Sequence, residues 1–169
     1  MIDLFYYHAL PEKGDILPSL WQAMKVDNPE PWVWGNAGVP SLANFIVYFS
    51  DEGRHLFLPF DPETRDCYGM LWVDELLVGV RARAHMYFFR KFQRKSGSPI
   101  VEACHAVLRA LSLPPFCLNV VYLYTDNRAV GVQNFAKKRM GATYVASLPQ
   151  YYPGETASVG YILLEKYRT

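Results

Sequence analysis

A short basic turn, Gln93-Arg94-Lys95-Ser96-Gly97-Ser98, is the stretch of this chain best suited to binding a ligand. Its single glycine lets the backbone approach a ligand closely. Pro99 follows, a residue suited to the first position of a helix, where unpaired N–H groups attract anions. Arg94 and Lys95 add positive charge. The turn is therefore a candidate site for an anion such as a pyrophosphate, with a solvated basic turn as the plain alternative.

The elements on either side of this turn would hold it in place. Residues 81–89 (RARAHMYFF) are rich in strand-forming residues and end in an aromatic run. After the turn, Ser98 is a good N-cap and Glu102 complements the helix dipole. The apolar residues that follow recur at helical spacing and predict one buried stripe: Ile100, Cys104, Val107, Leu108 and Leu111.

Composition narrows the class of protein. The chain has 169 residues, enough for one domain over 1–169. Its formal charge of +1 produces no strong positive potential that would attract nucleic acid or an anionic membrane surface. No apolar run reaches the ~18–20 residues of a membrane span, and no signal peptide is evident. The three cysteines, Cys67, Cys104 and Cys117, fit neither a zinc pattern nor a disulfide frame. We therefore expect a reduced, cytoplasmic protein without a metal.

Periodicity predicts a mixed α+β fold. Expected strands are 2–8, 55–60, 68–74, 76–89, 118–125, 142–148 and 158–167, with helices beginning at Ser19, Ser41, Pro99 and Asp126 or Asn127. A tight turn is expected at Asp74-Glu75, and a loose linker over 149–155. Strand, helix and strand in the middle of the chain imply a right-handed parallel crossover. The result is a sheet of about seven strands flanked by about four helices.

Two motifs on these elements carry a resemblance to a known family. Arg94 to Ser98 matches the pattern of Arg or Gln, two residues, Gly, one residue and then Gly or Ala between a fourth strand and a third helix, with Pro99 at the last position. Asn127 opens a later helix that ends at Gly141. In this order, over nearly the whole chain, they resemble the GCN5-related N-acetyltransferase (GNAT) superfamily, which has the acyl-CoA N-acyltransferase fold.

The resemblance implies a V-shaped opening between the fourth and fifth strands that receives acyl-CoA, with acetyl-CoA as co-substrate. It implies transfer of an acetyl or short acyl group to an amine, on a small molecule or a protein, by direct attack in a ternary complex. A backbone N–H near the end of the fourth strand, about Phe89, would bind the thioester carbonyl. The implied cofactor-binding residues are Phe88, Phe89, Arg94, Lys95, Ser96, Gly97, Ser98, Asn127 and Phe135.

The catalytic candidates are a base and an acid. His85 lies on the strand face of Tyr87 and Phe89, near where related enzymes place a Glu, and can accept a proton directly or through water. Its alternative is a hydrogen-bonded histidine of the sheet, and Asp74 and Glu75 are weaker candidates for the base. The Tyr that many relatives use as acid is Lys137 here. Tyr151 is therefore taken as the candidate acid, with Tyr152 and Tyr124 as alternatives.

A second class of function stays open. Pro99 stands where the family has a small residue, Lys137 where many relatives have Tyr, and Ala142, after Gly141, where Phe is usual. These departures favour a catalytically inactive protein of the same fold. Such a protein would be a structural or interaction partner, for example in an assembly of phage or prophage origin. A small-molecule binder without transfer is a third reading. Trp32, Trp34, Tyr151 and Tyr152 would line the opening with aromatic rings and hint at an apolar or aromatic amine as acceptor. A homodimer is left open.

Overall fold

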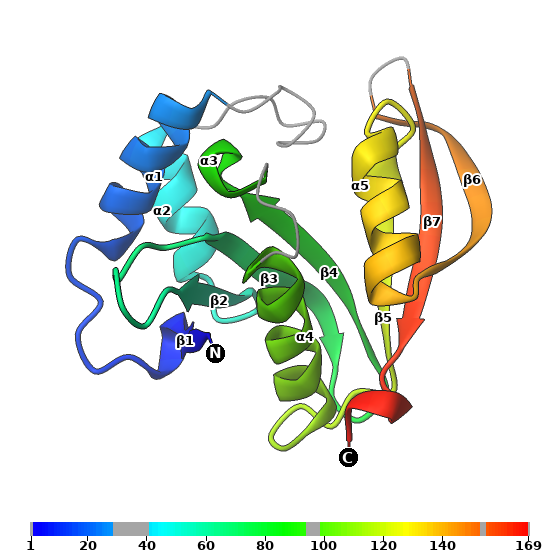
Figure 1. The fold of residues 1–169 in the computed structure, drawn as a ribbon, viewed down its shortest axis with the longest axis horizontal. Helices are drawn as coiled ribbons and strands as arrows, with labels where there is room; N and C mark the ends of the chain where they lie inside the picture. The colour runs from blue at the N-terminus through cyan, green and yellow to red at the C-terminus, as the bar shows by residue number, and fades with distance from the viewer. Residues whose placement is uncertain (1, 29–40, 94–98, 153–154, 169) are drawn as a thin grey trace.

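The computed structural model describes residues 2–28, 41–93, 99–152 and 155–168, with the backbone alone at 150–152 and 155. Seven strands of these residues form one sheet in the order β1-β2-β3-β4-β5-β7-β6 (Figure 1). This mixed sheet confirms the predicted α+β class and its number of strands. The strands are β1 (Asp3–Tyr6), β2 (His55–Phe60), β3 (Gly69–Leu77), β4 (Arg81–Phe88), β5 (Val120–Asp126), β6 (Thr143–Tyr152) and β7 (Glu155–Leu163).

The helices are α1 (Ile16–Asp27), α2 (Leu42–Ser50), α3 (Arg90–Gln93), α4 (Pro99–Ser112) and α5 (Val130–Phe135), which a π-helical turn (Ala136–Met140) extends. None of the described helices is long and apolar enough to cross a membrane. Helix α4 begins at Pro99 as predicted, and its whole predicted stripe is buried. Helix α1 begins before Ser19, because its buried stripe already includes Leu17.

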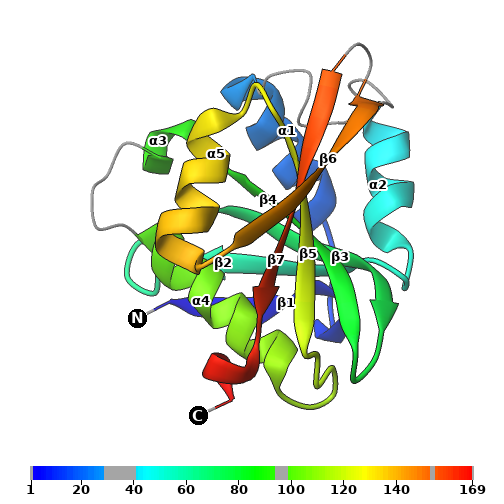
Figure 2. The same ribbon diagram turned by 90° about the vertical axis from the view of Figure 1, so that its right-hand side faces the viewer.

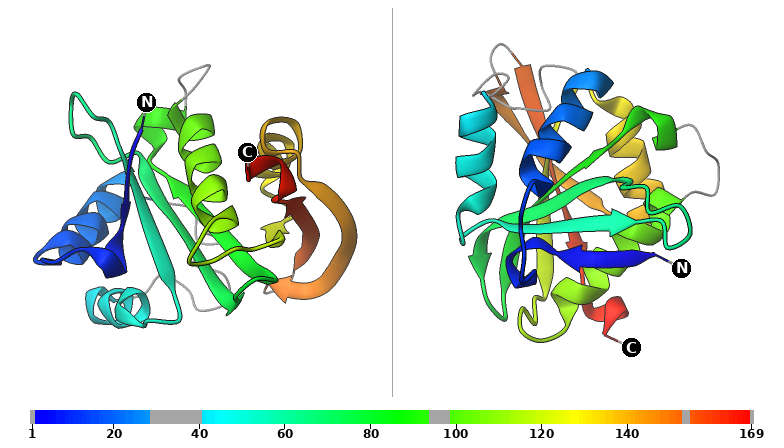
Figure 3. Two further views of the ribbon diagram at one scale, coloured as in Figure 1. Left: turned by 90° about the horizontal axis from the view of Figure 1, so that it is seen from below. Right: turned by 90° about the vertical axis from the view of Figure 1, so that its left-hand side faces the viewer.

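The helices divide between the two faces of the sheet, as Figure 3 shows. On one face, the Tyr87 hydroxyl of β4 donates to Asp27 at the end of α1. On the same face, Nε1 of Trp72 in β3 lies 3.3 Å from the hydroxyl of Tyr48 in α2. Alternate residues of a strand face opposite ways, so Met86 points to the other face, where α4 packs.

Strands β4 and β5 are parallel neighbours that pair only where they begin. Their register joins Arg81 to Val120 and ends with Arg83 opposite Tyr122. Beyond this point β4 continues to Phe88 and β5 to Asp126 without pairing to each other, while β5 stays paired to β7 along its length. Figures 1 and 2 show the two strands diverging from their common end. The predicted opening between the fourth and fifth strands is therefore present.

Two predicted connections are wrong. Strand β3 runs through Asp74 and Glu75 to Leu77, and the chain turns at 78–80, where Gly79 has a φ of 75°. Glu75 adopts a left-handed φ of 49° beside a register shift, so the two acidic residues form a bulge within a longer strand. The linker expected over 149–155 is also strand up to Tyr152 and again from Glu155. The backbone of Tyr151 therefore belongs to β6.

Candidate active site

The His85 side chain lies on the α1/α2 face of the sheet, against the strand β3. Its ring stacks on the Trp72 indole with 4.9 Å between centroids and 2° between planes. Its Nε2 atom lies 3.1 Å from Oδ1 of Asp74. Since the side chain keeps 28% of its surface exposed, His85 is at once held by the sheet and open to a ligand.

Asp74 is buried and contacts both His85 and Arg83, so it is the centre of a polar cluster formed by Asp74, Glu75, Arg83 and His85. Arg83 donates to it through two bonds, Nε to Oδ1 at 2.7 Å and Nη2 to Oδ2 at 2.9 Å, and also lies 3.0 Å from Glu75. Burial alone would raise the pKa of the Asp74 carboxyl, but hydrogen bonds from His85 and Arg83 outweigh it and hold that pKa below its ordinary value. Asp74 is therefore a carboxylate at neutral pH and a fixed acceptor for His85.

Among the candidate acids, the structure brings Tyr124 to this group. The Arg83 guanidinium lies over the Tyr124 ring at 5.9 Å from its centroid, on the same face of the sheet as His85. Two residues earlier on β5, Tyr122 makes a similar contact of 5.8 Å with Arg81. The side chains of Tyr151 and Tyr152 lie outside the described part of the chain.

The end of β4 presents backbone groups to the opening. The Phe89 N–H donates to the Tyr68 carbonyl in the direction of β3, so it is not available to a thioester carbonyl. Neighbouring residues of a strand point their backbone N–H and C=O groups to opposite sides. Since the N–H of Phe89 points to β3, the backbone groups of Met86 and Phe88 point to the opening. Val80 is an even number of residues before Met86 and Phe88, and its carbonyl accepts a bond from the Val120 N–H of β5, which agrees with this direction. Of the two residues predicted here, Phe88 and Phe89, only Phe88 has its backbone N–H directed to the opening.

Of the other predicted cofactor residues, the structure describes Asn127 and Phe135 but not the basic turn. Arg94, Lys95, Ser96, Gly97 and Ser98 lie outside the described residues. Asn127 follows the end of β5 at the rim of the opening, where its Oδ1 accepts a bond of 2.6 Å from Ser158. It does not cap α5, since the N-cap position is Ala129. Phe135 is half-buried and packs on the core.

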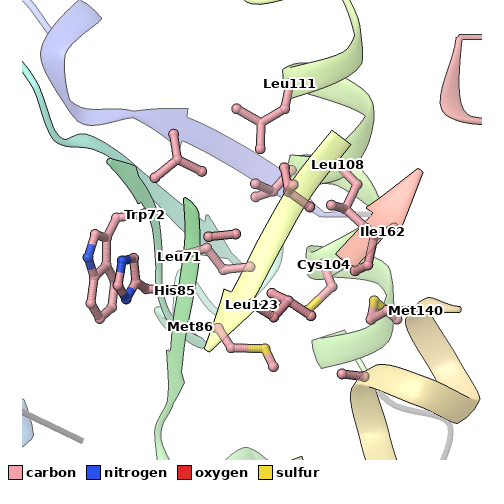
Figure 4. A pocket seen from close by; sticks show the side chains of 15 residues that line it. Leu71, Trp72, His85, Met86, Cys104, Leu108, Leu111, Leu123, Met140 and Ile162 are labelled. Carbon is pink, nitrogen blue, oxygen red and sulfur yellow. The ribbon is translucent and has the colours of Figure 1, made fainter. Parts of the chain in front are cut away.

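Between the two strands and α4 lies an apolar cavity of about 40 Å³ (Figure 4). Figure 4 shows the rings of Trp72 and His85 on the far side of the strand from Cys104, Met140 and Ile162. The cavity thus adjoins the His85 strand from the α4 side. Its lining is Leu71, Trp72, Val73, Ala84, His85, Met86, Cys104, Val107, Leu108, Leu111, Val121, Leu123, Ala136, Met140 and Ile162.

Reasoning from the sequence selected His85 but missed its partners. Trp72 and Asp74 face it across the β3–β4 ladder, where Trp72 pairs with His85 and Asp74 with Arg83. Once β3 is allowed to continue through the bulge, period-two alternation places Asp74 and Trp72 on one face. That alternation was the available signal, and the turn assigned to Asp74-Glu75 obscured it.

By sequence, the chain matches no family model and no curated protein. Solved structures match it over almost all of its length. One is a spermidine N-acetyltransferase from Vibrio cholerae in complex with CoA and spermine, with a TM-score of 0.77 and 16% identity over 99% of this chain and 98% of that one. Another is a spermidine/spermine N-acetyltransferase from Vibrio cholerae with manganese ions, at 0.69 and 15% over 98% and 94%. The sheet that opens between β4 and β5 is thus the acyl-CoA N-acyltransferase fold seen in GNAT enzymes.

Proposed function

We propose that this protein is an N-acyltransferase that moves an acetyl or short acyl group from acyl-CoA to an amine by direct attack. The observation that carries the proposal is the parting of β4 and β5 after Arg83 and Tyr122. Ligands of open sheets with parallel strands bind beyond the carboxyl ends of those strands. An extended thioester arm fits between two strands that have separated.

The residues at the opening suit such a donor. The arm of coenzyme A carries amide groups. The Met86 backbone and the Phe88 N–H face the opening as the edge of an unpaired strand does, while the Phe88 carbonyl accepts a bond from the Gln93 side chain. Helix α4 begins at Pro99, and the N-terminal end of a helix favours phosphate. The basic turn from Arg94 to Ser98 precedes it. Among these groups, the Phe88 N–H is our candidate for stabilising negative charge on the thioester oxygen.

The donor supplies a thioester carbon that an amine can attack, and His85 accepts the proton that the amine loses. A bond from its Nε2–H to Asp74 leaves Nδ1 as the accepting nitrogen. Direct attack is supported by the state of two cysteines. Burial raises the pKa of Cys104 to about 12 and that of Cys67 to about 11. Both are neutral thiols at physiological pH, which are poor nucleophiles for a covalent acyl intermediate.

The acceptor is proposed as a small amine. The two similar structures are of spermidine N-acetyltransferase from Vibrio cholerae, and one of them has spermine bound. In this chain the described wall beside His85 is aromatic, with Trp72, Tyr48 and Tyr124. The carboxylates of Asp74 and Glu75 are both paired with Arg83. We therefore propose testing aromatic amines such as tryptamine beside spermidine and spermine.

The test combines binding with turnover. Acetyl-CoA at 100 times its Kd should stabilise the protein by about 2.7 kcal/mol. With an amine panel, free thiol should appear, and His85→Ala should slow its release by roughly 100-fold or more without weakening CoA binding. His105→Ala is the matched control, because His105 lies on α4 beside Tyr167.

Three results would contradict parts of the proposal. Binding without thiol release from any amine would leave a cofactor binder of this fold. Neither binding nor release would favour the structural or interaction role. An unchanged rate in His85→Ala would remove that histidine from proton transfer while leaving the activity in place.

A further inference from the structure

We infer that the cavity between β4, β5 and α4 receives the acyl chain of the donor, so that the protein prefers propionyl- or butyryl-CoA to acetyl-CoA. The inference rests on the proposed function, since it assigns the acyl group of the same donor. It concerns the chain length that the site accepts.

The position of the cavity is the first reason. Its lining includes Ala84 and Leu123, the residues that directly follow the last paired residues of β4 and β5, Arg83 and Tyr122. The cavity therefore spans the point where the two strands separate, since its lining also includes Val121, which is still paired to Ala82. An acyl chain that leaves the opening toward its base enters this space, deeper in the sheet than the Phe88 amide.

The chemistry of the wall is the second reason. Apart from His85 and Trp72, whose rings point to the other face in Figure 4, the lining side chains are apolar or the thiol of Cys104. Burial keeps that thiol neutral by raising the pKa of Cys104 to about 12. A water molecule needs two to four polar partners to be held in a cavity, and this wall offers none that match. The occupant that fits is a hydrocarbon chain.

Size and adaptability are the third reason. A space of about 40 Å³ holds roughly three groups of the size of water, at about 10–15 Å³ each. Protein cores rarely contain voids larger than one water molecule, and an apolar cavity of this kind stays dry and can bind an apolar guest. Met86 and Met140 border it with flexible side chains that adjust to a chain of variable length.

The experiment measures Kd by calorimetry for CoA, acetyl-, propionyl-, butyryl- and octanoyl-CoA, with thiol release from each as a second readout. We expect Kd to fall about fourfold for each methylene from acetyl to butyryl, the factor for burying one methylene group. Octanoyl-CoA should lose the gain because its chain exceeds the space. Equal Kd values from acetyl to butyryl would overturn the inference.

Variants of the wall localise the effect. Cys104→Leu fills the cavity and should abolish the gain from acetyl to butyryl, whereas Ala106→Leu adds a similar side chain outside the lining on the same helix and should retain it. Met140→Ala enlarges the space and should extend the gain to hexanoyl-CoA, which keeps the inference testable if Cys104→Leu does not fold. An unchanged chain-length profile in Met140→Ala would overturn it.

Failure of the two proposals can be told apart. A chain-length gain in Kd without thiol release supports the acyl cavity and removes the transfer reaction. Thiol release with acetyl-CoA, together with equal Kd values for all acyl chain lengths, supports the transfer reaction and removes the acyl cavity. Failure of CoA itself to bind overturns both.

Discussion

Nε2 of His85 and Oδ1 of Asp74 are 3.1 Å apart, and the same oxygen accepts a bond of 2.7 Å from Nε of Arg83. The two bonds from Arg83 thus fix the orientation of the carboxylate that the imidazole contacts. A carboxylate at Nε2 selects the tautomer with its proton on that nitrogen and orients the ring. Asp74 is therefore a positioning residue for His85 in the proposed reaction.

Replacing this carboxylate tests the arrangement. Asp74→Asn keeps the size of the side chain and loses the charge, so kcat should fall by up to roughly 100-fold while KM for acyl-CoA stays unchanged. Steady-state kinetics with saturating amine measure both values. Asp61→Asn is the control, because Asp61 is a half-buried carboxylate that accepts a bond from Tyr68 outside the site. Equal loss of kcat in both variants would contradict a specific role for Asp74.

Asp74 should also make the free energy of unfolding depend on pH. Its pKa in the folded protein is lowered, so its contribution is fully present above the unfolded value of about 4 and is lost as pH falls through the lower folded value. At neutral pH, Asp74→Asn should cost roughly 3 kcal/mol, the typical effect of breaking a buried ion pair.

Urea unfolding of both proteins from pH about 7 to about 3 measures this dependence. The difference in free energy of unfolding between wild type and Asp74→Asn should shrink on acidification. A constant difference across this range would show that the charge of Asp74 contributes nothing to stability.

The close approach of β3 to the end of β4 gives a third prediction. A Cβ on Gly69 would lie 2.1 Å from the Tyr87 carbonyl oxygen and 2.7 Å from Cα of Phe88. Gly69→Ala must therefore push the strands apart, at about 1–3 kcal/mol of unfolding free energy. It should also raise Kd for CoA, because the Phe88 amide moves.

Gly131→Ala provides the matched control for this substitution. Gly131 lies in α5 with nothing within 4 Å of an added Cβ. Its replacement should be neutral or stabilise by up to about 1 kcal/mol. Thermal unfolding and calorimetry with CoA report the two effects, and a Gly69→Ala protein with unchanged Kd would separate the strand contact from cofactor binding.

The order of elements could be predicted because each carries a local signal. Helix α4 begins at Pro99, and its stripe from Ile100 to Leu111 is buried as its spacing indicated. Gly141, at a φ of 73°, ends the helical segment after α5 as predicted. These features depend on neighbours within a few residues, which a sequence displays directly.

The features that the sequence did not predict depend on partners distant along the chain. Asp74 and Glu75 resemble a turn, yet the ladder to β4 keeps β3 extended, with Asp74 opposite Arg83. The direction of the Phe89 N–H depends on Tyr68, a partner far away along the chain. Such contacts follow from register, and one unanticipated bulge changes which residues face a ligand.

The choice of proton donor gives the last prediction. Tyr124 lies on the His85 face of β5 with its ring under Arg83, where its hydroxyl is our candidate to protonate the departing thiolate. Tyr124→Phe keeps the ring and removes only the hydroxyl, so kcat should fall by roughly 100-fold with Kd for CoA unchanged. Tyr122→Phe is the matched control on the same strand face, beside Arg81, and should keep the wild-type rate. Single-turnover thiol release compares the variants. A wild-type rate in Tyr124→Phe would assign Tyr124 to packing against Arg83 and make Tyr151 of β6 the next residue to replace.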